Sequence, residues 1–421
     1  MSSYKNRSIE KKLNEMKDTY PVIMITGPRQ VGKTTLLNYL MTTSTEKINF
    51  ISLDDMKLRI QANDDPELFL RTHETPLIID EFQYAPNLLS YIKINIDKAR
   101  MNEMFGTKEK VKTMYYLTGS QVFQTMKNVS ESLAGRIGIL DLYAFSTREL
   151  YSKEEKVFVP NINELKNRDL VQKLTTKKLF ERILKGSYPE IYNQKNIDIE
   201  KYYEIYVRTY LERDIRQYIN IKDEIKFMKF ISSVAARTSC EYNASDIAND
   251  IEIDSKTVDE WLSVLKNTGL VFLLQPHMNN NVGRIIKRPK IYFMDTGLAC
   301  YLTGYTDATI LEKSAYNGAI FETYVITEII KSYTNNGKDP RKHLYYYRDN
   351  NQKEIDLLII DNNKIYPVEI KKSSNPGINA IKNFDVVKKF EMEVGNGIVL
   401  CMSDSIFAID ENNYYVPIEY I

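Results

Sequence analysis

Residues 27–34 read Gly-Pro-Arg-Gln-Val-Gly-Lys-Thr, which fits the pattern G-x-x-x-x-G-K-[ST] of a phosphate-binding loop. The residues before this stretch, Val22 to Thr26, are apolar and rich in β-branched side chains, as in a buried strand. The residues after it, Thr35 to Leu40, have the spacing that starts an amphipathic helix. A strand–loop–helix of this kind points backbone N–H groups and a helix N-terminus toward one place. The sequence therefore predicts a site for the β- and γ-phosphates of a nucleotide.

Within this segment, the residues expected to contact the nucleotide are consecutive: Gly27, Pro28, Arg29, Gln30, Val31, Gly32, Lys33, Thr34 and Thr35. Lys33 is expected to bring a positive charge to the phosphates, and the Thr34 hydroxyl is expected to be a Mg²⁺ ligand. A glycine-containing turn before a helix is the alternative interpretation. The flanking strand and helix patterns favour the phosphate site.

The composition is that of an ordinary globular chain, with 43% hydrophobic and 27% charged residues. Its 421 residues predict two to four domains. Lysine plus arginine number 57 and aspartate plus glutamate 56, so the overall charge indicates no particular partner. Three scattered cysteines and three scattered histidines make a zinc site or a disulfide framework unexpected. With no apolar run of membrane-spanning length and no secretory signal pattern, we expect a cytoplasmic protein without a membrane partner.

A pair of acids follows a second apolar run about fifty residues after the loop. Asp80 and Glu81 end the stretch that begins at Pro76. In P-loop enzymes the first acid of such a pair holds Mg²⁺, and the second polarises the attacking water. We therefore expect Asp80 to be a Mg²⁺ ligand and Glu81 to be catalytic.

A third apolar run, from Met114, ends in small polar residues, where many ATPases place a hydroxyl that senses the γ-phosphate. Thr118 and Ser120 are the candidates, although a plain turn after a strand explains these residues about as well. Farther on, Arg136 follows Gly135. It is a candidate arginine finger, acting on a neighbouring subunit or in cis, and the alternative is a surface arginine beside a helix-capping glycine.

Five segments together resemble the predicted AAA+ superfamily ATPases of bacteria and archaea, which join an N-terminal AAA domain to a poorly characterised C-terminal region. These segments lie at residues 27–34, 53–55, 79–83, 117–120 and 133–136. The order and spacing of the segments make the resemblance specific, and it covers nearly the whole chain. It implies ATP as the nucleotide, and the chain has no N-K-x-D motif that would favour GTP.

The middle of the chain is predicted to be helical. Residues 156–169 are polar and suit a boundary, and 202–216 have the spacing of a packing helix. From Lys226 the pattern indicates short helices, the last of them capped by Ser255, and then two strands. This order resembles a winged helix-turn-helix. The last helix carries acids that suit DNA phosphates poorly, whereas the expected wing is basic, with Arg284, Lys287, Arg288 and Lys290. Protein contact and nucleic-acid contact both stay open here.

A third constellation lies near the C-terminus. The segment 318–330 reads as a helix carrying Glu322, and the next strands carry Asp356 and then Glu369 with Lys371. An aspartate followed on the next strand by Glu-x-Lys resembles the PD-(D/E)xK restriction-endonuclease-like fold. That resemblance implies a metal site made by Glu322, Asp356 and Glu369, with Lys371 acting on the water. Half-exposed hairpins often show the same short pattern, and copies of this fold that do not cleave are frequent.

The prediction is thus an α/β protein with a P-loop AAA-type ATPase domain (1–155), a helical linker (156–224), a winged-helix-like domain (225–306) and a restriction-endonuclease-like α/β domain (307–421). Its expected activity is Mg²⁺-dependent ATP binding and hydrolysis that switches the C-terminal region. Two alternatives are an ATP-regulated DNA nuclease and a scaffold or signalling switch that binds ATP without hydrolysing it. The partners to consider are a second copy of the chain, DNA, or another protein bound through the C-terminal half.

Overall fold

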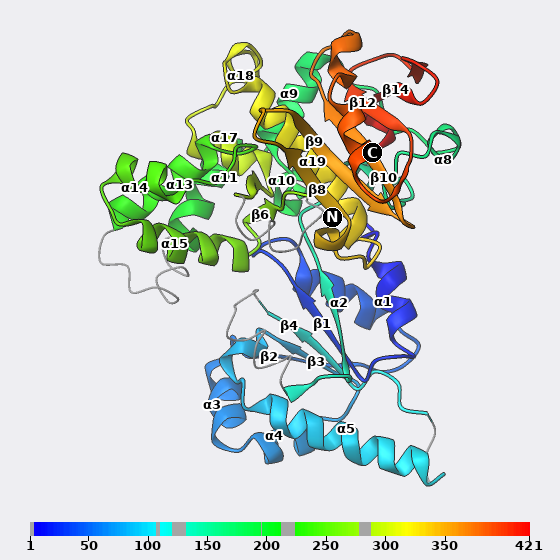
Figure 1. The fold of residues 1–421 in the computed structure, drawn as a ribbon. Coiled ribbons are helices and arrows are strands. Elements are labelled where there is room, and N and C mark those ends of the chain that lie inside the picture. Colours follow the sequence, from blue (N-terminus) through cyan, green and yellow to red (C-terminus); the bar gives the residue numbers. More distant parts are fainter. Residues whose placement is uncertain (1–3, 107–109, 120–131, 195, 212–223, 278–287) are drawn as a thin grey trace. The chain divides into compact units, whose positions relative to one another are not determined.

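In a computed structural model of the chain, the described residues are all except 1–3, 107–109, 120–131, 195, 212–223 and 278–287 (Figure 1). They group into two compact units. The first comprises Met1–Ala144, Asn267–Gly269 and Thr334–Gly337, and the second comprises Phe145–Lys266, Leu270–Tyr333 and Lys338–Ile421.

The first unit alternates helices with strands. In chain order its elements are α1 (Glu10–Met16), β1 (Val22–Thr26), α2 (Lys33–Thr43), β2 (Asn49–Ser52), α3 (Met56–Asp64), α4 (Pro66–Thr72), β3 (Leu77–Asp80), η1 (Phe82–Tyr84), α5 (Leu88–Met104), β4 (Tyr115–Thr118) and β5 (Ile137–Asp141). The strands form a five-stranded sheet in the order β2-β3-β4-β1-β5, and every pairing is parallel. The predicted α/β class and the predicted P-loop strand and helix are therefore present in the structure.

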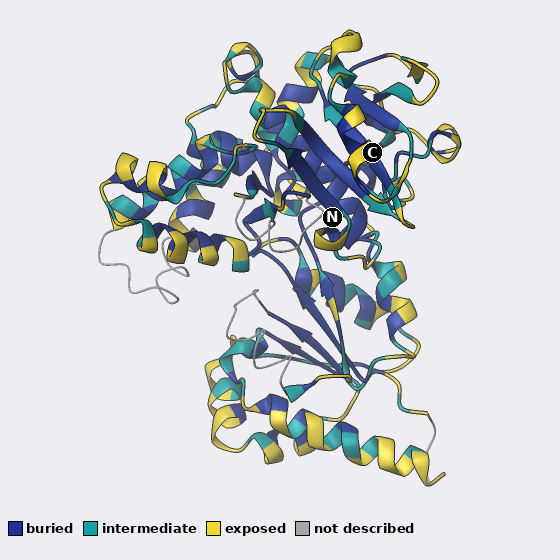
Figure 2. Ribbon diagram, in the orientation of Figure 1, coloured by how far each residue is buried: buried dark blue, intermediate teal, exposed yellow. Residues whose placement is uncertain are grey.

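Helices cover both faces of this sheet, with α1 and α2 on one face and α3, α4 and α5 on the other (Figure 1). Strands β1, β3 and β4 are buried along their whole lengths, which explains their continuous apolar sequences (Figure 2). Met24, Ile79 and Leu117 pack in one core cluster with Phe69 of α4 and Ile92 of α5. Because the strands are parallel, their carboxyl ends lie along one edge of the sheet, where ligands of such folds bind.

The second unit begins with helices. Its first helices are α7 (Thr147–Leu150), α8 (Ile162–Lys166), α9 (Thr176–Lys185), α10 (Pro189–Asn193) and α11 (Ile199–Tyr206), with a π-helical turn η2 (Val207–Leu211). Next come α13 (Glu224–Ala236), α14 (Ala244–Ile251), α15 (Ser255–Asn267) and the antiparallel pair β6 (Val271–Leu274) and β7 (Lys290–Phe293). Trp261 of α15 packs edge-on against Phe227 and Phe230 of α13, with ring centroids 5.1 and 5.4 Å apart.

The start of α15 differs from the prediction. Asp254, and not Ser255, is the capping residue, because its carboxylate accepts a hydrogen bond from the Thr257 N–H at 2.9 Å. Ser255 is the first residue of the helix. Both side chains suit an N-cap, and the sequence pattern alone does not separate neighbouring candidates.

The rest of the second unit surrounds a larger sheet. Helices α17 (Thr296–Leu302), α18 (Ala308–Lys313) and α19 (Asn317–Thr334) lead to η3 (Pro340–Lys342), β8 (Leu344–Arg348), β9 (Glu354–Asp361), β10 (Lys364–Ile370), η4 (Ile378–Ile381), η5 (Phe384–Lys389), β11 (Glu393–Val394), β12 (Gly397–Cys401), β13 (Phe407–Ala408), β14 (Asn413–Pro417) and η6 (Ile418–Tyr420). The seven strands have the order β13-β14-β12-β10-β9-β8, and β11 pairs with β10. Strands β8, β9 and β10 are antiparallel neighbours, so the hairpin predicted to carry Asp356 and Glu369 is formed.

Helix α19 is almost entirely buried from Ile320 onward (Figure 2). It contains an internal ion pair between Glu328 and Lys331 at 2.7 Å, and Glu328 also accepts the Thr147 N–H at 2.6 Å. These contacts compensate the cost of burying two charges. Among the described residues, no helix is both long enough and apolar enough to span a membrane.

Candidate functional site

The phosphate-binding loop leaves the carboxyl end of β1 and enters α2 at Lys33. Its backbone needs three left-handed positions, with φ of 142° at Gly27, 60° at Gln30 and 94° at Gly32. A Cβ atom at Gly27 would lie 1.9 Å from the carbonyl oxygen of Leu142, which belongs to rigid backbone next to β5. The first glycine of the motif is thus required by the close approach of two backbone segments.

Lys33 is buried, with 7% of its surface exposed, in the closed loop. Its ammonium group donates hydrogen bonds to the carbonyl oxygens of Gly27 at 3.0 Å and Pro28 at 2.8 Å. Burial lowers the pKa of Lys33 to about 8, while the negative charges of Glu81 and Asp80 act in the opposite direction. In this state the lysine therefore bonds to the loop itself, and an incoming phosphate would offer it a negative partner.

Asp80 and Thr34, the two residues predicted to hold Mg²⁺, are in direct contact. Asp80 ends β3 and is buried, and its Oδ1 accepts a hydrogen bond from the Thr34 hydroxyl at 2.8 Å. The same oxygen accepts a second, short hydrogen bond from the hydroxyl of Thr118, which ends β4. A carboxylate beside a hydroxyl at the start of a P-loop helix is an oxygen donor set that suits Mg²⁺. Three residues predicted from the sequence thus meet at the carboxyl edge of the sheet: Thr34 of α2, Asp80 of β3 and Thr118 of β4.

Glu81 follows Asp80 with a left-handed backbone, φ 54°. Its N–H donates to the Thr118 hydroxyl at 3.2 Å, and its carboxylate accepts a short hydrogen bond from the side-chain amide of Gln83. The other atom of that amide, Oε1, is buried and has no hydrogen-bond partner in the described part of the chain. No role was predicted for Gln83, which stands two residues after Glu81 in the segment 79–83 that carries part of the family resemblance.

Two other predicted residues need separate comment. Ser120 lies outside the described residues. Thr35 lies in the first turn of α2 and is exposed.

Arg136 lies at the far end of the sheet from the loop of the same chain. Its carbonyl accepts the N–H of Val22, the first residue of β1, whereas the loop follows the last residue of that strand. Five strand residues span about 16 Å. Its guanidinium forms an ion pair with Asp97 of α5 at 2.7 Å. The geometry therefore contradicts the in-cis form of the arginine-finger prediction. Two interpretations stay open: an arginine finger for a neighbouring copy, and a surface arginine beside Gly135.

In the second unit, Asp356 and Glu369 lie on adjacent strands, with Lys371 between them. The Lys371 ammonium is 2.6 Å from Glu369 and 3.7 Å from Asp356, and the other partner of Asp356 is the Ile370 N–H at 2.9 Å. Burial raises the pKa of Glu369 to about 8, and the nearby negative charge of Asp356 acts in the same direction. The predicted Asp–Glu–Lys group is thus assembled on one side of the hairpin.

Glu322 has different partners from those expected. Its carboxylate accepts a hydrogen bond from the Tyr292 hydroxyl at 2.6 Å and pairs with Lys290 at 3.3 Å. Burial raises the pKa of Glu322 to about 7, with a further rise from Asp356. Across the described residues, no three or more histidine, cysteine, aspartate or glutamate side chains are grouped to hold a metal ion. The prediction that Glu322 completes a three-carboxylate metal site with Asp356 and Glu369 is therefore wrong for this structure.

Lys290 also corrects a prediction. It was expected to face a nucleic-acid backbone from a wing, yet it is 3% exposed and pairs with Glu322 and with Glu354, the latter at 2.5 Å. The charge of Lys290 is compensated inside the unit, because Glu322 of α19 and Glu354 of β9 lie beside β7. The sequence pattern alone does not show that these three elements are neighbours. Of the other expected wing residues, Arg288 is exposed, and Arg284 and Lys287 lie outside the described residues.

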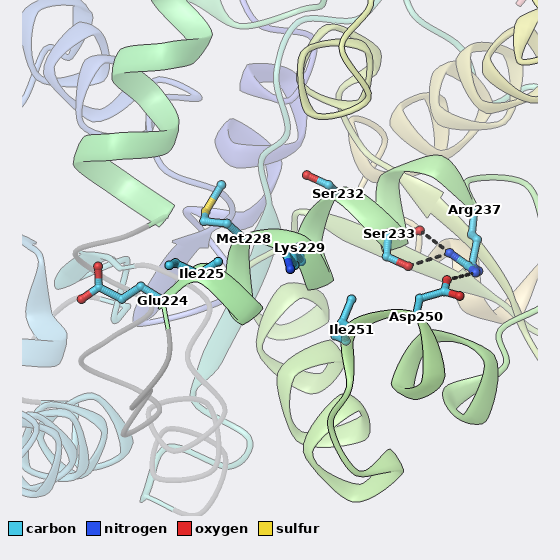
Figure 3. Close-up of a pocket in the computed structure, with 9 residues that line it drawn as sticks. All are labelled: Glu224, Ile225, Met228, Lys229, Ser232, Ser233, Arg237, Asp250 and Ile251. Atoms are coloured by element: carbon cyan, nitrogen blue, oxygen red, sulfur yellow. Dashed lines mark hydrogen bonds and ion pairs between the residues drawn. The ribbon is translucent and has the colours of Figure 1, made fainter.

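A separate hollow of about 740 Å³ lies on α13 and α14 (Figure 3). Its lining is mixed in character: Glu224, Ile225, Met228, Lys229, Ser232, Ser233, Arg237, Asp250 and Ile251. Arg237 donates to Ser233 at 2.6 Å and pairs with Asp250, so its charge is already compensated (Figure 3). None of the residues predicted to be functional lines this hollow.

Three family models match successive parts of the chain. One, described as "AAA domain", matches residues 19–151, and two described as domains of unknown function, DUF8612 and DUF4143, match residues 176–309 and 317–421. The first match contains the loop, the acid pair Asp80 and Glu81, and Arg136. The N-terminal part of the chain is therefore a P-loop domain of the AAA ATPase type.

Relatives extend over most of the chain. It is 25% identical over 404 residues to the uncharacterized proteins Rv2008c of Mycobacterium tuberculosis and Mb2031c of Mycobacterium bovis, a match covering 95% of this chain and 81% of each relative. Among solved structures, the Walker-type ATPase PABY2304 of Pyrococcus abyssi is 16% identical, covering 70% of this chain and 94% of that one, with a TM-score of 0.41. The ORC2 protein of Aeropyrum pernix is 16% identical, covering 70% and 90%, with a TM-score of 0.33. Structural likenesses at this level carry no conclusion about function.

Proposed function

We propose that this protein is a Mg²⁺-dependent ATPase whose nucleotide state switches its C-terminal region. The observation that carries the proposal is the contact between Thr34 and Asp80, which joins the P-loop helix to the acid pair beside a buried lysine. When bound, Mg²⁺ would neutralise part of the charge on the β- and γ-phosphates. Thr34 and Asp80 would hold the ion, and the residues from Gly27 to Thr35 would bind the phosphates.

The chain's own residues then have distinct roles. Lys33 exchanges its loop carbonyls for phosphate oxygens, which turns a buried, poorly compensated charge into a paired one. Glu81 orients the attacking water, and the Gln83 amide bonded to it sets the direction of its carboxylate. Thr118, which contacts both Asp80 and the Glu81 backbone, is placed to respond to the γ-phosphate.

Arg136 would complete this site from a second copy of the chain. Its ion pair with Asp97 lies at the edge of the sheet opposite its own loop, which supports a role toward the γ-phosphate of a neighbouring copy and not toward its own. This part of the proposal implies a homo-oligomer in which each subunit supplies the arginine for the next.

A thermal-shift experiment tests nucleotide binding. We expect Mg·ATP to raise the Tm of the wild-type chain and to leave the Tm of Lys33→Ala unchanged, because the substitution removes the buried cation at the phosphates. Lys47→Ala, which removes an exposed lysine after the same helix, is the matched control and should respond like the wild type. An equal ATP-induced shift in Lys33→Ala would contradict the proposal.

A second candidate activity is phosphodiester hydrolysis by the C-terminal hairpin. The favouring observation is that Lys371 lies within ion-pair distance of both Asp356 and Glu369, which is the predicted arrangement of a water-activating lysine beside two acids. Asp356 and Glu369 would then hold the divalent ion without Glu322. In this candidate the three helices and strand pair from α13 to β7 act as a winged-helix-like contact to DNA. The alternative is that they contact a protein partner.

A further inference from the structure

We propose that Arg7 is a positioning residue of the nucleotide site and that it presets the phosphate-binding loop by holding the carbonyl group of Val31. The inference deepens the proposed function and rests on it, because it concerns how the loop is shaped to receive phosphates. Arg7 is not among the residues that the sequence predicts to be functional.

The guanidinium of Arg7 lies between two backbone segments that are far apart in the sequence. Arg7 is 5% exposed. Its Nη1 donates to the carbonyl oxygen of Val31 at 2.9 Å, and its Nη2 donates to the carbonyl oxygen of Tyr143 at 2.6 Å. Val31 is inside the loop, and Tyr143 is two residues after β5. The side chain of Arg7 therefore connects the phosphate-binding loop to the segment that follows β5, the strand at the edge of the sheet.

The bond to Val31 also determines where a neighbouring N–H points. The carbonyl of Val31 and the N–H of Gly32 belong to one planar trans peptide, so they point in opposite directions. Gln30 and Gly32, on either side of Val31, both have left-handed backbones, with φ of 60° and 94°. Because Arg7 draws the Val31 carbonyl to itself, it turns the Gly32 N–H to the other side of the peptide. That is the direction in which a bound phosphate would accept it.

An arginine suits this position better than a lysine would. A guanidinium presents several N–H donors in a rigid plane and stays charged when buried, whereas the three N–H donors of an ammonium rotate about one nitrogen on a flexible stem. Two carbonyls from separate segments need two donors in a fixed geometry. The fixed charge of Arg7 also adds positive potential at the loop, where phosphates bring negative charge.

The segment that carries Arg7 is itself anchored. Its N–H donates to Glu10 at 2.6 Å, and the Tyr4 hydroxyl donates to the same carboxylate oxygen at 2.7 Å. The Tyr4 ring stacks on Tyr39 of α2 with a centroid distance of 3.9 Å. The N-terminal segment is thus attached to the helix that follows the loop, which holds Arg7 in register with Val31.

Calorimetric titration of the full chain with Mg·ATP and with inorganic tripolyphosphate tests the inference. We expect Arg7→Ala to weaken binding of both ligands about tenfold or more and by similar factors, because the defect lies in the phosphate loop. Arg7→Lys should fall between the alanine variant and the wild type, since it keeps the positive charge but loses the rigid, planar arrangement of donors on two nitrogens. Leu13→Ala, a core truncation in α1, is the matched control: it should lower the Tm while leaving both affinities within about twofold.

Each outcome separates the two proposals. Wild-type protein that binds neither ligand would refute the proposed function itself. Wild-type protein that binds both ligands, with Arg7→Ala binding them equally well or losing only as much affinity as Leu13→Ala, would overturn the role of Arg7 alone. If Arg7→Ala does not fold, the comparison of Arg7→Lys with the wild type decides, and equal affinities would overturn the inference.

Discussion

At the scale of single residues, Lys33 shows how the loop balances burial against charge. Its ammonium is nearly removed from water and has only carbonyl oxygens as hydrogen-bond acceptors, so its protonated form is less stable than in a free lysine. Burial lowers its pKa from 10.5 to about 8. The phosphates of ATP would supply the missing negative partner and raise the pKa again.

This shift gives ATP binding a predictable pH dependence. Below about pH 8 Lys33 already carries its proton, so affinity for Mg·ATP should be constant. Above about pH 8 binding must take up a proton, and affinity should fall by up to about tenfold per pH unit. In Lys33→Arg the guanidinium stays charged, so the decline should disappear if this variant binds ATP. Titration calorimetry from about pH 7 to about pH 9.5 measures the effect. A wild-type affinity that does not change over this range would contradict it.

The lowered pKa of Lys33 also determines how its contribution to folding stability changes with pH. The unfolded chain keeps the Lys33 proton up to about pH 10.5, whereas the nucleotide-free folded chain releases it near pH 8. The contribution of Lys33 to folding therefore becomes more favourable as the pH rises between these values. Bound ATP should reduce that dependence.

At the scale of elements, strand β5 lies between the phosphate-binding loop and Arg136, the two places where function is proposed. Its carboxyl end adjoins the loop, where Leu142 approaches Gly27, and its amino end follows Arg136. The strand thus sets the distance between the phosphate site and the arginine of one chain. A site that needs this arginine has to be completed by another copy.

Mixing inactive subunits tests this arrangement. Arg136→Ala keeps an intact loop, and Lys33→Ala keeps an intact arginine, so a mixture of the two should recover part of the ATPase rate that each lacks alone. The rate per wild-type subunit should also rise with protein concentration. Arg100→Ala, which removes an exposed arginine of α5, is the control and should not lower the rate. No recovery in the mixture together with a concentration-independent rate would exclude action in trans.

The sequence predicted those features that depend on neighbouring residues. The loop with its strand and helix, and the hairpin carrying Asp356 and Glu369, follow from local patterns of apolar residues and glycine. The contacts that changed the interpretation join residues far apart: Arg136 with Asp97, and Lys290 with Glu322. A basic residue looks the same in the sequence whether it faces solvent or an internal acid. Only packing of distant elements decides between the two.

At the scale of the whole molecule, the second unit pairs each of two lysines with two acids: Lys290 is buried, and the Lys371 side chain is 42% exposed. Lys371 is shared by Asp356 and Glu369, and Lys290 is shared by Glu322 and Glu354. Pairing of this kind compensates the negative charges of the acids. Asp356, Glu369 and Lys371 would be needed for catalysis if this unit cleaves DNA.

Substitution of Lys371 separates a structural role from a catalytic one. If the hairpin cleaves DNA with Mg²⁺ or Mn²⁺, Lys371→Ala should stop cleavage while divalent binding by calorimetry stays within about threefold, because the lysine acts on water. Lys372→Ala, the adjacent lysine, is the control and should cleave normally. If a chain carrying only Lys33→Ala, which disables ATP binding, binds no divalent ion, the nuclease candidate is refuted and a partner-binding role is favoured.

The central claim is that the acid pair after β3 completes a working ATPase site. The most direct measurement is the rate of Mg·ATP hydrolysis by the full-length wild type and by Glu81→Gln, with ATP affinity measured in parallel. We predict hydrolysis by the wild type, and in Glu81→Gln an unchanged affinity with turnover reduced at least about a hundredfold, because the amide binds the site but cannot accept a proton from water. Hydrolysis by Glu81→Gln at the wild-type rate, or wild-type protein that binds ATP without turning it over, would contradict the account.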